Sequence, residues 1–233
     1  MNAHSLAVLG NGIPWVLGIS LLIVLFSGND RLDRLDAILV GLALLFAAVP
    51  QTASLLVVMN PHPVVDGEQD TTVSLLLLVQ IAAFSLSHLL LAVRHGRTPT
   101  ADRTRTVAPS FRIRTLVAGS VLVFIGALMV FAAHRHVLHL LMLPLLAGGV
   151  SLWVAGDAAS VDRFPSTNTL LILLGVGFWF LHELISSAYY ISGSEYHTAA
   201  LVDMLCRFSS AFLYQPSLIM LSLSVYRFGD NPH

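Results

Sequence analysis

The feature that most constrains this chain is a series of apolar runs, each about 20 residues long. A helix rises about 1.5 Å per residue, so such a run can cross a hydrocarbon core about 30 Å thick. The composition agrees, because the 233 residues are 56% hydrophobic and only 11% charged, whereas a soluble domain is typically about 25% charged. The sequence therefore predicts an all-α integral membrane protein and disfavours a soluble fold.

Polar connectors divide the chain into seven apolar spans, which together account for one seven-helix domain. The predicted transmembrane spans are residues 6–26, 37–59, 71–93, 115–133, 137–155, 167–191 and 198–226. The first five residues carry no arginine or lysine, and no small-residue cleavage site follows the first run, so we expect no removable signal peptide.

The basic residues predict how the bundle is oriented. The chain has 12 arginines and no lysine. The first, third and fifth connectors and the C-terminal tail carry ten of them: Arg31, Arg34, Arg94, Arg97, Arg103, Arg105, Arg112, Arg114, Arg163 and Arg227. The opposite connectors carry only Arg135. Because arginines gather on the cytoplasmic side of membrane proteins, the N-terminus is predicted outside and the C-terminus in the cytoplasm, in the plasma membrane.

Ionisable residues inside the last two spans mark the predicted functional site. His182 and Glu183 interrupt the sixth span, and Asp203 and Arg207 interrupt the seventh. Charged groups at membrane depth are costly, so they usually face the bundle interior, pair with one another and mark function. Helix rise places Glu183 roughly 12 Å and Arg207 roughly 13 Å below the outer surface. We therefore predict an intramembrane salt bridge between Glu183 and Arg207, with Asp203 one turn away.

The charges of this predicted cluster do not balance. Two carboxylates and one arginine leave one excess negative charge, and an arginine does not release its proton. Either a carboxylate is neutral or His182 is protonated, which is the situation that proton relays and pH-dependent switches use. The alternative is a static ion-pair clasp between the last two spans.

A second candidate site is formed by three histidines near the outer ends of the fourth and fifth spans. His134, His136 and His139 are spaced so that zinc or copper is a conceivable ligand. Arg135 lies among them, and the spacing matches no specific metal motif, so interfacial histidines in a turn are the alternative. No cofactor can be named from the sequence.

Several other residues have ordinary structural interpretations. His88, near the inner end of the third span, is expected to be hydrogen-bonded within the bundle. Cys206 is expected to be a small packing residue. The small residues Ala147, Ser151 and Ala155 recur every four positions and would let another helix approach closely. Nothing in the sequence favours nucleic-acid binding.

The predicted topology and a few residues resemble the microbial rhodopsins. Asp203 followed four residues later by Arg207 is similar to that family's seventh-helix pattern of aspartate and retinal lysine, and Val49-Pro50 and Gly67-Glu68-Gln69 fall in similar places. The resemblance implies a seven-helix fold. Arginine stands in the lysine position, and the sixth-helix Trp-Tyr-Pro pattern and the third-helix acidic residues are missing, so a Schiff-base retinal protein is excluded.

These observations lead to one main functional hypothesis and several alternatives. The main hypothesis is a membrane sensor or small-molecule-binding protein whose outer half holds His182, Glu183, Asp203 and Arg207. The first alternative is a membrane-embedded metal-dependent enzyme or metal-handling protein that uses the outer histidines. A proton-coupled carrier, and a subunit of a homo-oligomer or a larger membrane complex, remain open.

Overall fold

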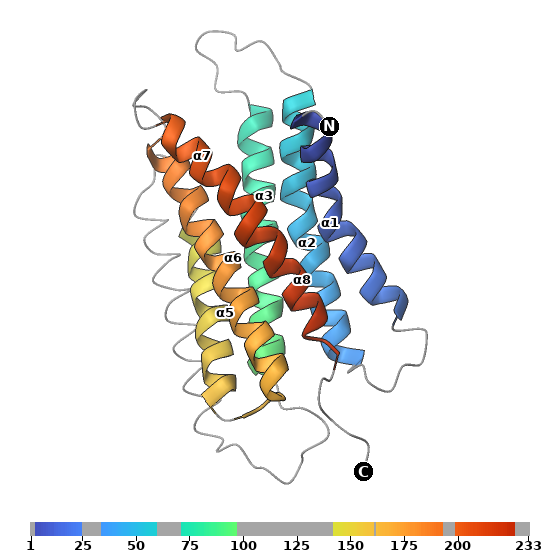
Figure 1. Ribbon diagram of the computed structural model, residues 1–233. Coiled ribbons are helices and arrows are strands. Elements are labelled where there is room, and N and C mark those ends of the chain that lie inside the picture. The colour runs from blue at the N-terminus through green and yellow to red at the C-terminus, as the bar shows by residue number, and fades with distance from the viewer. Residues whose placement is uncertain are drawn as a thin grey trace.

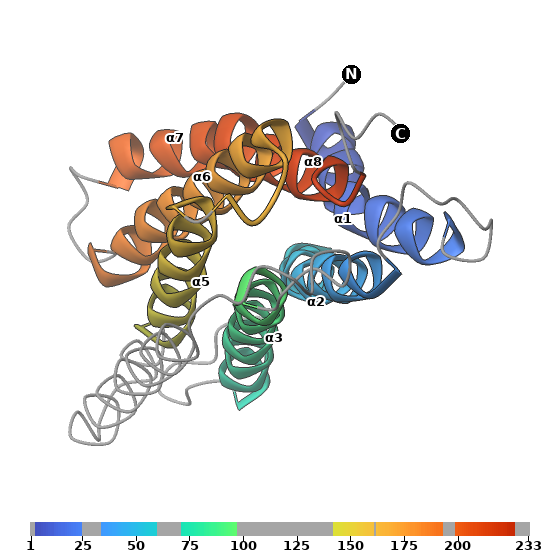
Figure 2. The ribbon, with the colours of Figure 1, turned by 90° about the horizontal axis from the view of Figure 1, so that it is seen from below.

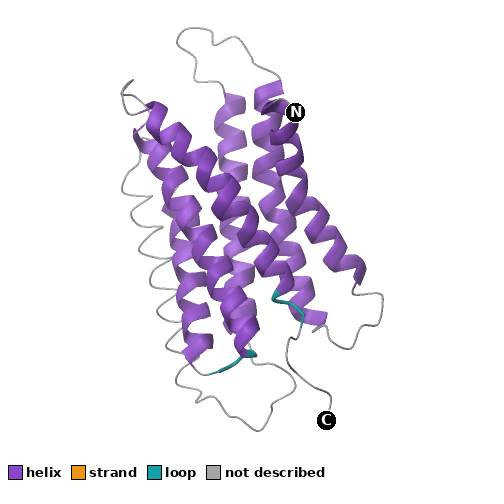
Figure 3. Ribbon diagram, in the orientation of Figure 1, coloured by secondary structure: helices purple, strands orange, loops and turns teal. Residues whose placement is uncertain are grey.

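The computed structural model describes residues 3–24, 34–59, 71–96, 142–160, 162–192 and 199–226. Within these ranges the chain is helical and contains no β-strand (Figure 3). The helices are α1 (Ala3–Val24), α2 (Arg34–Met59), α3 (Thr71–Gly96), α5 (Met142–Ser160), α6 (Ser166–Ser192), α7 (Ala199–Ser209), the π-helical segment η3 (Ser210–Tyr214) and α8 (Gln215–Leu223). The predicted fourth span and the three outer histidines lie outside the described residues.

The described helices follow the predicted spans closely, with one correction in α5. The predicted fifth span ended at residue 155 and was followed by a loop, but α5 continues to Ser160. Gly156 does not end the helix because Ala155 and Ala158 are both buried against the bundle. The helix ends in a Schellman turn, in which Arg163 N donates to Ala158 O and Asp162 adopts a left-handed φ of 48°.

The helices lie side by side as an elongated bundle (Figure 1). Seen along the bundle, α3, α2, α1, α8, α6 and α5 follow one another around a common centre (Figure 2). The packing agrees with this order: α3 packs against α2 and α5, and α6 packs against α5, α7 and α8. The core is built from buried aliphatic side chains with Trp179 and Tyr214 at its centre.

The surface and length of the helices are those of a membrane protein. Three helical segments are long and apolar enough to cross a bilayer: Leu78–Gly96, Leu143–Ser160 and Ser166–Ser187. Large apolar side chains such as Val16, Leu170 and Phe212 are exposed on the outside of the bundle. A lipid environment covers such a surface without the cost that water would impose. The chain is a helical membrane protein.

Small residues allow the helices to approach closely. A Cβ atom added at Gly18 of α1 would lie 2.9 Å from Leu45 Cδ2 and 3.1 Å from the carbonyl oxygen of Gly41 in α2. Gly175 of α6 is similarly tight against Leu221 of α8. The predicted small-residue stripe on α5, which comprises Ala147, Ser151 and Ala155, is buried.

A π-helical turn interrupts the last helix. The N–H of Gln215 bonds to the carbonyl of Ser210, five residues earlier, and Pro216 follows directly. Proline has no N–H, and its ring collides with the carbonyl four residues earlier in a regular helix, so the wider turn accommodates it. The wide turn ends at Tyr214, whose side chain is fully buried in the core.

Candidate functional site

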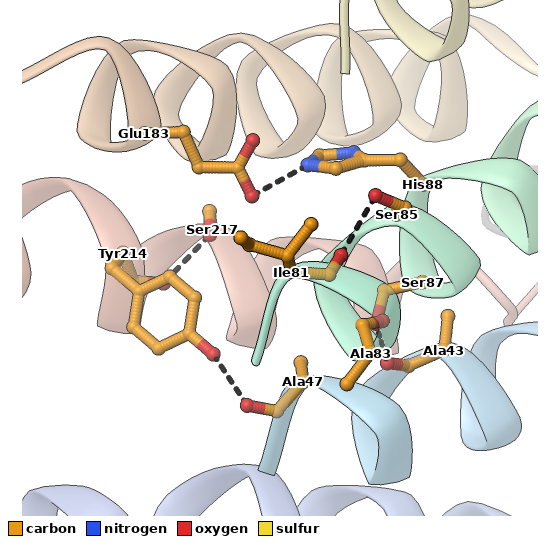
Figure 4. Close-up of polar contacts among 10 residues, drawn as sticks. All are labelled: Ala43, Ala47, Ile81, Ala83, Ser85, Ser87, His88, Glu183, Tyr214 and Ser217. Atoms are coloured by element: carbon orange, nitrogen blue, oxygen red, sulfur yellow. Dashed lines mark hydrogen bonds and ion pairs between the residues drawn. The ribbon is translucent and has the colours of Figure 1, made fainter. Parts of the chain in front are cut away.

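The centre of the bundle holds a buried histidine–carboxylate pair. His88 of α3 and Glu183 of α6 point toward each other (Figure 4), with 2.8 Å between His88 Nε2 and Glu183 Oε1. The His88 side chain is fully buried and the Glu183 side chain is 6% exposed. An ionisable pair this deep in an apolar bundle is costly to bury, which makes it the strongest functional candidate in the described part of the chain.

Helix α5 lies between the two helices that carry the pair and leaves room for it at a glycine. A Cβ atom added at Gly148 would lie 3.3 Å from His88 Nε2, 3.4 Å from Glu183 Oε2 and 3.0 Å from Phe180 Cδ2. The contacts with Phe180 and His88 are tighter than a Cβ atom normally makes, and the contact with Glu183 is at the limit of ordinary packing. Glycine at position 148 therefore permits the pair to form across the face of α5.

Aromatic rings surround one side of the pair and connect it with His182. The Trp179 ring lies 4.8 Å from the His88 ring, and Tyr214 meets Trp179 edge-on at 5.7 Å between centroids. Tyr214 also lies 4.9 Å from the His182 ring and donates its hydroxyl to Ala47 O of α2. These contacts restrain the His88 ring, because Trp179 and Tyr214 are themselves fully buried.

The pair uses only part of its hydrogen-bonding capacity. Among the described residues, no partner lies within hydrogen-bond distance of Glu183 Oε2 or His88 Nδ1. The indole nitrogen of Trp179 likewise has no partner there. Buried polar groups are normally satisfied by protein or by internal water. The pair therefore has hydrogen-bonding capacity that the described side chains do not fill.

The structure places the four predicted site residues in different environments. Glu183 is in the core, as predicted, but its ion pair is with His88. Arg207, the predicted partner, has an exposed side chain on α7. His182 is half-buried, with its Nδ1 3.0 Å from Ser209 Oγ. Only the backbone of Asp203 is among the described features, so the predicted Asp203–Arg207 contact remains a prediction.

The partner of His182 indicates that its Nδ1 carries a proton. Ser209 Oγ lies 2.9 Å from the Cys206 carbonyl and donates its hydroxyl proton to it. Ser209 Oγ therefore accepts a hydrogen bond from His182 Nδ1–H. His182 is thus hydrogen-bonded to Ser209, and the rings of Tyr214 and Trp179 lie between it and His88.

A second buried charge, Arg94, lies at one end of the bundle and is paired with groups from two other helices. Its Nε is 3.2 Å from Asp36 Oδ2 of α2, and its terminal nitrogens donate to the hydroxyl and the carbonyl of Ser224 at the end of α8. Asn168 of α6 donates to the same carbonyl. Sequence analysis placed Arg94 in a basic connector, so its full burial is a correction. This network ties four helices together and is structural.

His88 is the residue of this candidate site that the sequence did not indicate. Counted from the end of the bundle where α3 begins and α6 ends, His88 lies roughly 25 Å along its helix and Glu183 roughly 14 Å. Side chains lean toward the N-terminus of their helix, so on these antiparallel helices they reach toward each other. An estimate based only on the depth of each Cα atom leaves out this side-chain direction and therefore does not pair His88 with Glu183.

Neither metal-site geometry nor known relatives point to another site. Within the described ranges, no group of three or more His, Cys, Asp or Glu side chains is placed to hold a metal ion. Comparison with protein-family models, with curated proteins and with solved structures found no match. The resemblance to the microbial rhodopsins therefore rests on the sequence features alone, and a functional assignment has to come from the His88–Glu183 pair.

Proposed function

We propose that this chain is a seven-helix membrane sensor that responds to protons through the His88–Glu183 pair. The observation that carries the proposal is the burial of a titratable pair, 2.8 Å apart, between two helices that pack mainly on other neighbours. The proposal keeps the predicted sensor and the predicted Glu183, and replaces Arg207 by His88 as the partner.

The chemistry of the pair supports a switch. With one proton between them, the imidazole and the carboxyl group are net neutral, whichever atom carries the proton. A second proton leaves a net positive charge in the core, and loss of the proton leaves a net negative charge. Either charge is strongly disfavoured in an apolar interior. The neutral pair therefore favours the compact arrangement of α3 and α6, and the charged pair favours an arrangement that admits water or separates the helices.

The distribution of arginines supports an orientation for this sensor. Arg34 begins α2, Arg94 lies in the last turn of α3, and Arg163 follows α5, so all three lie at the same end of the bundle. The positive-inside rule makes this the cytoplasmic end, with the N-terminus outside, in a plasma membrane. The seven-span topology is part of the proposal.

The experiment measures the α3–α6 separation as a function of pH. Spin labels are attached to Leu89→Cys and Leu184→Cys, two exposed positions on α3 and α6, in a Cys206→Ser background that removes the single native cysteine. We expect a pH-dependent second distance population in lipid bilayers. Glu183→Gln should reduce the response and shift the pH at which it occurs, because the amide cannot ionise to balance a protonated His88. His182→Gln, a change at the adjacent histidine, should retain it.

Two results would contradict the proposal. One is a distance distribution that stays the same at every pH at which the protein is folded. The other is a pH response of the same size in Glu183→Gln as in the unmodified pair. A response lost in His182→Gln and kept in Glu183→Gln would transfer the sensing role to His182.

A further inference from the structure

Three buried polar groups with unfilled hydrogen bonds lie along the interface between α3 and α5. They are His88 Nδ1, Ser151 Oγ and the His95 ring, whose hydrogen-bonding neighbour among the described residues is the Ser151 backbone, so that at least one His95 nitrogen is unfilled. All three side chains are fully buried. The three side chains follow one another along this interface, and two further unfilled atoms, Glu183 Oε2 and Trp179 Nε1, belong to residues that contact His88 at one end of this line.

Helix register places the three groups in sequence along that line. Gly148 of α5 lies against His88, and Val154 of α5 lies against Gly96 at the end of α3. The two helices therefore run in parallel, and Ser151 falls between these two contacts. The His95 ring lies beside the backbone carbonyl of Ser151. His88 and His95 are separated by seven residues, or two helical turns, which is roughly 10 Å along α3.

The far end of this line reaches the loop between α5 and α6. His95 contacts the edge of Phe164 at 6.5 Å between ring centroids, and Arg163 donates to the His95 carbonyl. Both loop residues are partly exposed. The line thus runs from the His88–Glu183 pair to the surface at the end of the bundle that carries Arg94.

We infer that a file of internal water molecules occupies the α3–α5 interface and connects the pair with the Arg94 end. Each group on the line is a donor or acceptor that water can satisfy, and buried water typically makes two to four such bonds. The side chains of three residues line these water molecules: His88, Ser151 and His95. We call the water molecules together with these side chains the α3–α5 file. The inference rests on the proposed function, because it gives the route by which a proton reaches the pair.

The transfer along this file is a simple relay. A proton enters at the loop, each water molecule passes on one proton as it accepts another, and the net result is one proton added to the pair. The other charged or titratable groups near this route are Glu183 from α6, Arg94 from α3, Asp36 from α2 and Arg163 from the loop. Helix α5 contributes Gly148, Ser151 and Val154 to the interface and carries Asp157 one turn beyond Val154. The pair would then sense the pH of the compartment at the Arg94 end.

The experiment uses the full chain in lipid bilayers with ¹⁵N-labelled histidine. Solid-state NMR measures magnetisation transfer from water to the imidazole nitrogens, with signals assigned by His88→Gln and His95→Gln. We expect both imidazoles to receive magnetisation from water. Ser151→Ala should weaken the transfer to both, because it removes the hydroxyl between them. Ser87→Ala is the matched control: Ser87 is equally buried, but its hydroxyl lies 2.9 Å from the Ala43 and Ala83 carbonyls, away from the file.

A kinetic measurement separates this inference from the proposed function. After a pH jump at the Arg94 end of oriented proteoliposomes, Trp179 fluorescence follows proton arrival at His88. Ser151→Ala should slow the fluorescence change severalfold without moving the equilibrium titration. Ser87→Ala should leave the rate of the fluorescence change as it is. If the pair titrates but His88 and His95 show no water contact, or if Ser151→Ala behaves as Ser87→Ala does, the inference is overturned and the proposed function stands. If the imidazoles are hydrated but the pair does not titrate, the proposed function is overturned.

Discussion

At the scale of single residues, the central polar feature of the interior is the His88–Glu183 pair, for which Gly148 leaves room. Glu183 was predicted to pair with Arg207, whereas in the structure it is buried and paired with His88. The error has a physical cause: an arginine in an apolar helix can extend its charge along the surface, and the Arg207 side chain is exposed. The true partner could not be found by counting depth, because side-chain direction decides which groups meet.

The ion pair can be measured by a double-mutant cycle. Glu183→Leu or His88→Leu alone leaves one buried polar group without its partner, which typically costs about 3–5 kcal/mol if that group is charged. The double variant should cost clearly less than the sum, as the free energy of unfolding in mixed micelles reports. In the matched cycle, which combines Glu183→Leu with Arg207→Leu, the two costs should be additive, because Arg207 is exposed. Additivity in the His88 cycle would show that the pair makes no energetic contribution.

Gly148 gives a second test at this scale. Gly148→Ala introduces a Cβ atom 3.0 Å from Phe180 Cδ2 and 3.3 Å from His88 Nε2, and overpacking of this kind costs about 1–3 kcal/mol. Gly156→Ala, in the same helix, meets nothing within 4 Å and should be neutral or stabilising by up to about 1 kcal/mol. Thermal unfolding in detergent compares the two. Equal stability of the two variants would contradict the packing described around the pair.

At the scale of secondary-structure elements, apolar length was a reliable guide and local backbone detail was not. The predicted spans and the described helices agree to within a few residues, except at the end of α5. A glycine normally weakens a helix, but buried Ala155 and Ala158 hold α5 together through Gly156. The π turn before Pro216 was also beyond prediction, since a proline indicates a disturbance of the helix without specifying its form.

The Schellman turn after α5 leads to a prediction about Asp162. Its φ of 48° is unfavourable for most L-residues by about 1–2 kcal/mol, although aspartate tolerates it better than most. Asp162→Gly should therefore raise the free energy of unfolding by up to about 1 kcal/mol. Asp162→Val, which is β-branched, should lower it. A glycine variant less stable than the valine variant would contradict the turn geometry.

At the scale of the whole molecule, the arginines connect the fold to its membrane orientation. Arg94 was predicted from composition as a loop residue, yet it is fully buried and joins α2, α3 and α8. Composition identified the end of the bundle at which arginines gather. It could not show that one of them is part of the core, because that depends on the Asp36 carboxylate and the Ser224 carbonyl being brought together by the fold.

The orientation is testable by cysteine accessibility in a Cys206→Ser background. Asp162→Cys, at an exposed position at the Arg94 end, should react with a membrane-impermeant maleimide only after the cells are permeabilised. Glu68→Cys, in the connector predicted to lie outside, should react in intact cells. The reverse pattern would invert the bundle and place the opening of the α3–α5 file on the outer side.

The measurement that tests the central claim most directly is a pH titration of Trp179 fluorescence. In a Trp15→Phe, Trp153→Phe background, Trp179 is the only tryptophan, and its ring lies 4.8 Å from the His88 ring. A protonated imidazole quenches a neighbouring indole, so the fluorescence should fall as the pair gains a proton. The pH-dependent change in fluorescence should disappear in His88→Gln. In Glu183→Gln its midpoint should shift to a different pH. Fluorescence that does not change with pH, or that changes equally in His88→Gln, would contradict the account of the pair as the proton-binding centre.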